Sequence, residues 1–459
     1  MTPSKIEAST VHKPSIQPIL LDFLIMALLC FVAIAWGAKR PWSMCLFSAA
    51  AITIWSWRLL LESARGCIRL YFSWTYIPAF GLLALTVMQR LNPQTALIPK
   101  VGFLPYTLEP HSTKLYLILA FGYAALGLSV IHGFSTQKQL IRFIVFLIGL
   151  GVLESLYGIV QHLTNFVTVW DLPVLSGSAH GTLTNRNHYA LLLNLSISMG
   201  VGFLYKKSVD FFQDQRFRLR LLPRMPDSAQ LAWIIAWLAL IGLGVLLSLS
   251  RTGIFAMFAC VAVMMIAARS TQKSHLAPFL VLATACVIVG LGVYTGVDGL
   301  LARYAGLLEP GYFEQDRIPI WRDAWKMVCS HPWFGQGAGS FQWAFPAYET
   351  FEPDRPAVFA HNDYLQFLAE YGVVGLGLAL WLLISCWRSA MRNLKAQGPL
   401  VRGIAIAALG ALTATAIQEI TDYSLFTPGI AAMLVGIVAL NERVSRDQPA
   451  MDTTEAESP

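Results

Sequence analysis

Long apolar runs alternate with short polar gaps along almost the whole chain. Most runs are about twenty residues long, the length that a helix needs to cross the hydrocarbon core of a bilayer. They lie at residues 18–37, 43–61, 70–89, 115–134, 141–163, 189–205, 230–249, 252–268, 277–297, 365–387, 403–420 and 428–440. The pattern predicts an all-α polytopic membrane protein with about twelve transmembrane helices.

One polar interval, residues 298–363, is much longer than the other gaps and is rich in Trp and Gly. It divides the chain into five predicted parts. These are a cytoplasmic N-terminal segment (1–17), transmembrane helices 1–9 (18–297), a long extracytoplasmic loop with short amphipathic helices (298–363), transmembrane helices 10–12 (364–440) and a disordered cytoplasmic tail (441–459). The first run is longer than the apolar region of a typical signal peptide, so we keep it as a span.

Composition supports a membrane protein over a soluble one. The 459 residues are 56% hydrophobic and 13% charged, whereas roughly a quarter of the residues of a soluble domain are charged. The net charge of +7 could suit nucleic acid, but most basic residues lie in the gaps between apolar runs, where they orient spans in the bilayer. The seven cysteines form no CxxC pair, which argues against a disulfide framework or a zinc site.

Basic residues also predict which way the spans run. The gaps at 206–224 and 388–402 carry most of them, and the positive-inside rule places these gaps in the cytoplasm. The long loop then faces the periplasm of a bacterial inner membrane. Lys39 and Arg40 fall on the outer side in this scheme, an exception that the pattern does not explain.

Two stretches place arginines beside apolar spans. Arg251 lies in SLSRTG between two spans with hardly any loop; it either anchors a helical hairpin at the interface or binds an anionic headgroup such as a diphosphate. Residues 317–328, RIPIWRDAWKMV, predict an amphipathic interfacial helix. Arg322, with Arg317, either lies at the lipid headgroups or binds the same anionic group as Arg251.

His361 comes just before a predicted N-cap, Asn362, at the end of the polar interval. The imidazole is either structural or a general base at the mouth of a membrane cavity. Residues 335–340, GQGAGS, favour a tight turn over a phosphate-binding nest, and no strand precedes them as a nucleotide site would require.

Other polar residues near span ends predict cavity lining or glycan contacts. They are Glu154 within the fifth run, Asn185, Arg186 and Asn187 before the sixth, and Asp422 after the eleventh. Asn187 could equally cap a helix. Glu352 and Asp354 lack a DxD motif or a histidine cluster, so we predict no metal site and no cofactor.

Several of these motifs together resemble the O-antigen ligase and polymerase superfamily. They are SRTG after an apolar span, the RxxxW of 317–321, HPWFGQGAGSF, AHNDYLQFLAEYGVVG, and a late span that ends near Asp422 and is followed by Pro428. The resemblance covers roughly residues 180–430.

The resemblance implies a metal-independent membrane glycosyltransferase that inverts the anomeric carbon. Its donor is a glycan on undecaprenyl diphosphate, and its acceptor is a second glycan, lipid A-core or a protein hydroxyl. Carried over by motif, Arg251 and Arg322 bind the diphosphate, His361 activates the acceptor, and Asp422 matches an acidic position of less certain role. We favour polymerisation of surface or exopolysaccharide repeat units, with ligation, protein glycosylation and assembly partners left open, and a lipid or polysaccharide transporter as the competing class.

Overall fold

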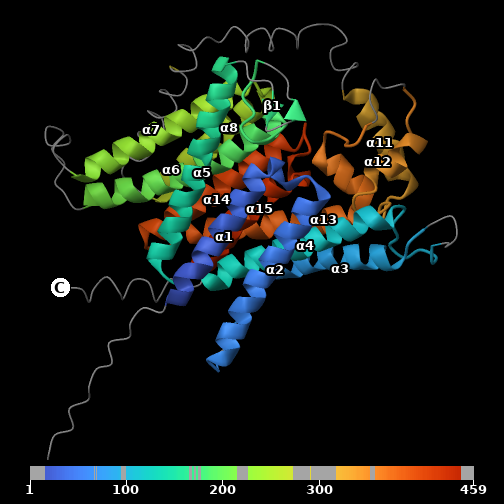
Figure 1. Ribbon diagram of the computed structural model, residues 1–459, viewed down its shortest axis with the longest axis horizontal. Helices are drawn as coiled ribbons and strands as arrows, with labels where there is room; N and C mark the ends of the chain where they lie inside the picture. The colour runs from blue at the N-terminus through green and yellow to red at the C-terminus, as the bar shows by residue number, and fades with distance from the viewer. Residues whose placement is uncertain are drawn as a thin grey trace, which may run out of the picture.

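The computed structural model is mainly helical (Figure 1). It describes residues 16–66, 68, 70–94, 100–164, 168–169, 172–173, 177–213, 226–271, 290, 317–351 and 357–445. The longer helices are α1 (Ile16–Ile34), α2 (Pro41–Ala64), α3 (Tyr76–Leu91), α4 (Pro110–Gly133), α5 (Gln137–Thr164), α6 (Arg186–Gln213), α7 (Pro226–Leu247), α8 (Arg251–Thr271), α11 (Ile318–Ser330), α13 (Asp363–Asn393), α14 (Pro399–Gln418) and α15 (Pro428–Val444). The short elements are η1 (Trp36–Ala38), β1 (Thr168–Val169), β2 (Leu172–Pro173), α12 (Phe341–Ala344), η4 (Phe345–Ala347) and η5 (Ser424–Phe426).

Among the described residues, eight helices are long and apolar enough to cross a membrane: α2, α4, α5, α6, α7, α8, α13 and α14. The apolar helices α1 and α3 and the 17-residue α15 coincide with three more predicted runs. The predicted span at 277–297 lies outside the described residues apart from Gly290, as do residues 298–316 of the predicted loop. The helical membrane architecture is confirmed, whereas the number twelve stays a prediction.

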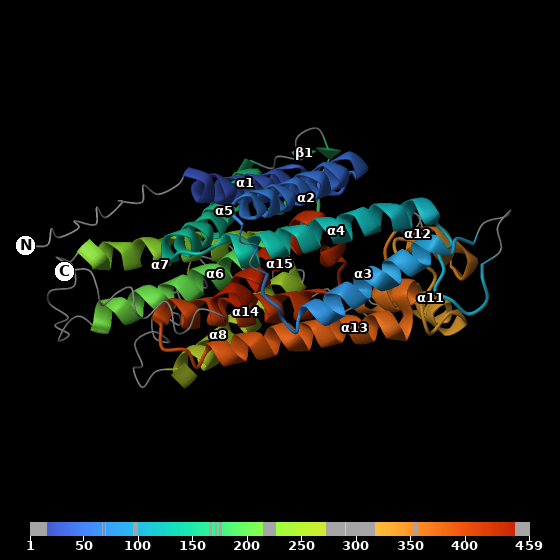
Figure 2. The ribbon, with the colours of Figure 1, turned by 90° about the horizontal axis from the view of Figure 1, so that it is seen from below.

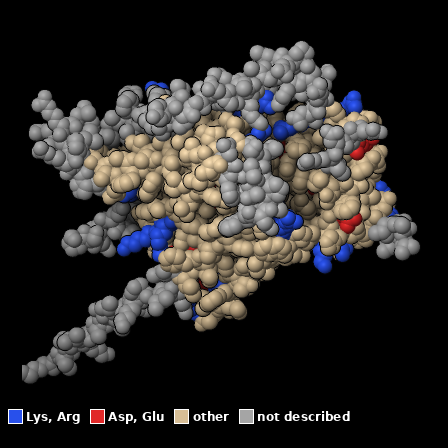
Figure 3. Space-filling view, turned by 45° about the horizontal axis from the view of Figure 1, so that its top comes forward, with Lys and Arg blue, Asp and Glu red and all other residues tan. Residues whose placement is uncertain are grey.

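Most of the long helices run along the long axis of the molecule, whereas α1, α2 and α5 are steeply inclined to it in Figure 1. α11 and α12 lie at one end of the molecule (Figure 2). α6 is the central helix, since all residues of its most apolar 18-residue stretch are buried. In α14, which lies beside it, 78% of the corresponding stretch is buried. By contrast, α2 and α13 are only 28% and 22% buried. Their exposed apolar side chains, such as Leu60 and Trp381, form a surface suited to lipid, and Figure 3 shows that much of one face is free of charged side chains.

Glycines let α6 and α14 approach until their backbones touch. A Cβ on Gly202 would lie 2.2 Å from the carbonyl oxygen of Gly403, and a Cβ on Gly403 would lie 2.4 Å from that of Gly202. Small residues allow this close approach between membrane helices, where packing rather than the hydrophobic effect drives association. The contact holds α6 and α14 together near the start of α14.

The predicted amphipathic helix is present as α11, and one of its faces is buried. Ala324, Met327 and Val328 pack against Phe341 and Phe345 in a small apolar cluster. Ile318 and Trp325 are exposed, as expected of a helix that lies in the membrane interface with apolar side chains towards lipid.

Two glycines join the segment after α11 to α13. A Cβ on Gly335 would lie 2.3 Å from the backbone of Glu370, and a Cβ on Gly372 would lie 2.3 Å from the backbone of Trp333. Both glycines have positive φ, 65° and 66°, a conformation that glycine adopts without a steric penalty. The HPWFGQGAGSF and HNDYLQFLAEYGVVG motifs are therefore locked together as one unit.

We expect Gly202→Ala to destabilise the protein by about 1–3 kcal/mol, because the added methyl would meet a backbone carbonyl that has no room to move. Thermal unfolding of the purified protein in detergent measures the change. Gly149→Ala is the matched control, since a Cβ there has nothing within 4 Å. Equal stability of both variants would show that the helices do not depend on this contact.

Candidate functional site

The turn between α14 and α15, residues 419–427, is the meeting point of segments from across the chain. The hydroxyl of Thr421 contacts that of Thr252 in the first turn of α8 at 2.7 Å. The guanidinium of Arg317 donates to the carbonyl oxygen of Thr421. The backbone N–H of Asp363, at the start of α13, donates to the carbonyl of Glu419 at 3.0 Å. Three segments distant in sequence thus converge on one turn.

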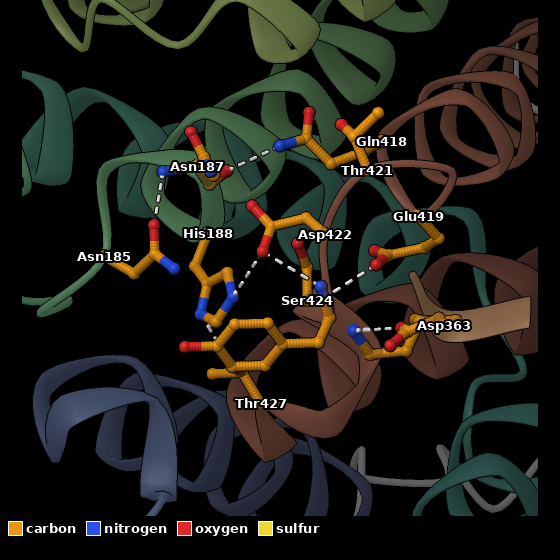
Figure 4. Close-up of polar contacts among 12 residues, drawn as sticks. Asn185, Asn187, His188, Asp363, Gln418, Glu419, Thr421, Asp422, Ser424 and Thr427 are labelled. Carbon is orange, nitrogen blue, oxygen red and sulfur yellow. Dashed lines mark hydrogen bonds and ion pairs between the residues drawn. The ribbon is translucent and has the colours of Figure 1, made fainter. Parts of the chain in front are cut away.

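Asp422 is the buried acid of this turn, with none of its surface exposed. One of its oxygens, Oδ1, lies 3.5 Å from Nε2 of His188 and accepts the backbone N–H of Tyr423 at 2.9 Å. Figure 4 shows His188, on α6, between Asp422 and Thr427. Burial would raise the pKa of Asp422, but the hydrogen bond with His188 and the charge of Arg317 contribute to lowering it to about 2.

Tyr423 gathers aromatic rings around the same turn. Its ring centroid lies 4.9 Å from that of His361 and 4.7 Å from that of His188, both edge-to-face. Phe359 stacks on it at 4.1 Å. Burial, reinforced by the charge of Asp422, raises the pKa of Tyr423 to about 12. The predicted base His361 is therefore held against the turn that carries Asp422.

Backbone strain concentrates at this site. Within the described ranges, four residues other than glycine have positive φ: Trp36 (53°), Ala38 (57°), Leu249 (54°) and His361 (51°). Such conformations cost energy and persist where the surrounding structure enforces them, often at functional sites. Leu249 comes two residues before Arg251, and His361 is itself the predicted base.

Arg251 is the first residue of α8, and the SRTG motif explains its position. The Ser250 hydroxyl accepts the backbone N–H of Gly253 at 3.2 Å and so caps the helix. A Cβ on Gly253 would lie 2.5 Å from that of Ala190, so α8 begins directly against α6. With Thr252 on Thr421, Arg251 lies beside the 419–427 turn.

The two arginines of the α11 region differ in position. Arg317 contacts the 419–427 turn through Thr421. The side chain of Arg322 is 60% exposed; its Nη2 donates to Thr350 at 3.1 Å, and its Nε lies 3.5 Å from Asp323. The structure therefore brings Arg317, rather than Arg322, into contact with the turn that carries Asp422.

The other predicted contacts mostly hold loops in place. Asn185 caps α6 by accepting the N–H of Asn187 at 2.8 Å, so the cap lies two residues before the predicted one. The carbonyl of Asn187 accepts from Gln418 at 3.1 Å. Arg186 opens α6 at the same end of the bundle. Glu154 is buried and accepts both the N–H and the hydroxyl of Thr182, at 2.8 and 2.6 Å.

The glycine-rich loop at 335–340 already holds an anion from the chain itself. The backbone N–H groups of Gly339 and Phe341 donate to the carboxylate of Glu370 at 2.8 and 3.3 Å. Gln366 donates to the same carboxylate at 3.3 Å. This geometry fits the tight turn favoured by the sequence, with a carboxylate in the place that a phosphate would take in a nest.

An apolar cavity of about 540 Å³ reaches the back of the turn. Helices α3, α4, α13, α14 and α15 line it, and Asp363, Glu419 and Phe426 are among its lining residues. Burial raises the pKa of Glu419 to about 8. The Ser424 N–H donates to Glu419 at 2.7 Å and the Leu425 N–H to Asp363 at 3.1 Å, so the same two acids also shape the turn.

The candidate site also contains three residues that the sequence did not indicate as site residues: Lys39, His188 and Tyr423. Lys39 Nζ lies 3.0 Å from Nδ1 of His188 and 5.2 Å from the ring centroid of Tyr423. The sequence did mark Lys39 in one way, because Lys39 and Arg40 are the two cations that depart from the positive-inside pattern. No comparable signal marks Tyr423, because its neighbours come from distant parts of the chain.

The arrangement can bind and stabilise an anion next to a histidine. Fixed cations in a partly buried site stabilise negative charge more strongly than they would in water. In the described part of the chain, no group of three or more His, Cys, Asp or Glu residues is placed to hold a metal ion. Glu352 and Asp354 lie outside that part.

A family model matches part of the chain. No curated protein matches the chain. The sequence model of the O-antigen ligase family matches residues 235–382, a stretch that includes Arg251, Arg317, Arg322 and His361. This match supports the assignment of the chain to the O-antigen ligase and polymerase superfamily.

Proposed function

We propose that the protein transfers a glycan from undecaprenyl diphosphate to an acceptor hydroxyl at the outer face of the bacterial inner membrane, and that it polymerises surface or exopolysaccharide repeat units. The single observation that carries the proposal is that Arg317, His361 and Thr252, the neighbour of Arg251, all contact the 419–427 turn. The reaction uses no metal and no nucleotide sugar, since fixed cations stabilise the leaving diphosphate.

Each residue has a defined role in this reaction. His361 accepts the proton of the acceptor hydroxyl as its oxygen attacks the anomeric carbon. The bond from that carbon to the diphosphate oxygen breaks, and Arg251 and Arg317 hold the developing charge. Attack from the side opposite the diphosphate inverts the anomeric configuration. Asp422 keeps His188 and Arg317 in place beside the reacting groups.

The apolar cavity behind the turn supports a lipid-linked donor. It lies among helices with lipid-exposed faces and extends to Asp363 and Glu419 of the site. A polyprenyl chain there would place its diphosphate near the arginines. A transporter would also need spans and buried charges, but the strained histidine beside a buried acid favours chemistry at this end.

A deletion strain tests the reaction class. If the protein is a polymerase, we expect the strain to lose long surface or secreted polymer and to keep single lipid-linked repeat units, as seen by gel analysis of its glycans. Accumulation of finished polymer on the lipid carrier would instead identify a ligase. Loss of glycan from a protein, with polymer intact, would identify a protein glycosyltransferase, and an unchanged glycan profile would contradict all three.

We expect His361→Asn to reduce glycan transfer by ~10²–10⁴-fold, because it removes the base. Asparagine tolerates the left-handed backbone of this position better than most residues do, so the fold should persist. Rates with purified protein in proteoliposomes provide the measurement. His111→Ala, at an exposed histidine that begins α4, is the control; full activity of the His361 variant would remove this residue from the mechanism.

Arg251→Ala and Arg317→Ala should each slow transfer by about 10–100-fold, the loss of a charged hydrogen bond to the diphosphate. Arg322→Ala should cost less, since its guanidinium binds Thr350 and Asp323 on the exposed face of α11. The same rate assay compares the three variants. A larger loss for Arg322 than for Arg317 would restore the assignment implied by the motif.

A further inference from the structure

Lys39 has the same structural setting as the predicted site residues, although it lies more than 200 residues before Arg251 in the chain. The turn that presents it, Trp36–Ala38, has positive φ at three consecutive residues: 53°, 69° and 57°. Together with Leu249 and His361, Trp36 and Ala38 make up the left-handed residues other than glycine in the described ranges. Strain of this kind is maintained at turns that present Lys39, Arg251 and His361.

The turn is pressed against the site by close packing. A Cβ on Gly37 would lie 2.4 Å from the side chain of Thr427 and 2.9 Å from that of Leu183. Thr427, in turn, contacts Nδ1 of His188 at 2.8 Å. The backbone of the 36–38 turn therefore lies directly against Thr427, and only glycine fits at position 37.

His188 orients the Lys39 ammonium. An ammonium group can only donate, so Nδ1 of His188, 3.0 Å from Nζ, has to accept. The ring proton then lies on Nε2, which faces Asp422 at 3.5 Å. This contact uses one of the three N–H donors of Lys39, and the ring of Tyr423 stabilises the cation from one side. Since the Lys39 side chain is only partly buried, its other donors can reach a ligand.

Two cations lie close to one buried acid in the part of the chain that the structure describes. Asp422 interacts electrostatically with both Lys39 and Arg317. Burial raises the pKa of the neighbouring acid Glu419 to about 8. Cations grouped in this way raise the local concentration of anions.

We propose that Lys39 is a third cation of the donor site and binds an oxygen of the lipid diphosphate, positioned by the chain of contacts from Asp422 through His188. This proposal rests on the proposed function for its ligand. Lys39 acts there by charge and hydrogen bonding, and His188, which is fully buried, acts through Lys39 as a positioning residue.

A binding experiment tests this role without a glycan acceptor. The full-length protein in lipid nanodiscs is titrated with undecaprenyl diphosphate, and with undecaprenol as a probe that lacks the anion. We expect Lys39→Ala to weaken binding of the diphosphate by about 10–100-fold and to leave undecaprenol binding unchanged. Arg40→Ala is the matched control, because this neighbouring cation is exposed at the start of α2.

The pH dependence separates a ligand contact from a packing role. Burial lowers the pKa of Lys39 to about 8 despite the nearby charge of Asp422, so wild-type affinity should fall as pH rises through 8 and the ammonium loses its proton. Lys39→Arg keeps its charge there and should extend binding to higher pH. The other titratable groups around Lys39, namely His188, Asp422, Tyr423 and His361, are the same in both proteins. Glu419, which gains negative charge in the same pH range, is also the same in both, so the difference between the two pH profiles reports on Lys39.

The outcomes distinguish this proposal from the proposed function. Wild-type affinity in Lys39→Ala, with weakened binding in Arg251→Ala, would overturn the role of Lys39 and leave the donor assignment in place. Wild-type affinity in both variants would overturn both. Thermal unfolding in the same nanodiscs shows whether Lys39→Ala folds. If it does not, Lys39→Arg still tests the proposal, because loss of diphosphate affinity at the same pH in Lys39→Arg and in the wild type would contradict it.

Discussion

The buried carboxylate of Asp422 is the constraint around which one end of the bundle is built. A charge removed from water at the end of membrane helices is stable only with partners that offset its lost hydration. Those partners come from separate parts of the chain: His188 from α6, Arg317 from the start of α11, and Lys39 from the turn before α2. Satisfying one acid therefore brings together groups that could act on a substrate.

The contacts of the 419–427 turn hold several residues of the candidate site together. Thr421 bonds to α8 and to Arg317, Thr427 bonds to His188, and Tyr423 packs on His361. A change in the turn would consequently alter several site groups at once. This explains why variants at the ends of the contacts, such as Lys39 and Arg251, are more informative than variants of the turn itself.

Features determined by neighbours in sequence could be predicted, while those determined by packing could not. Apolar runs located most of the helices, and the Asn362 cap on α13 is confirmed by its bond to the Leu365 N–H at 2.9 Å. The number of spans was harder to predict, because helices such as α3, with 16 residues, are shorter than the roughly twenty residues that a spanning helix needs. The buried face of α11 depends on packing, since the residues that cover it, Phe341 and Phe345, follow a turn whose path depends on Glu370.

The candidate site shows the same division. Arg251 and His361 could be selected because each lies beside a recognisable helix start. Lys39 could be noticed as a cation on the unexpected side of the membrane, but its partner is His188, 149 positions away. A contact of that separation depends on how α1, α6 and α15 pack, which no local pattern specifies.

The carboxylate of Glu370 inside the glycine-rich loop has a further consequence. Because the chain supplies its own anion to these backbone donors, the loop can adopt its final shape before any substrate arrives. Little conformational entropy would then be lost at residues 335–341 if a ligand bound beside them, so more of its interaction energy would appear as affinity.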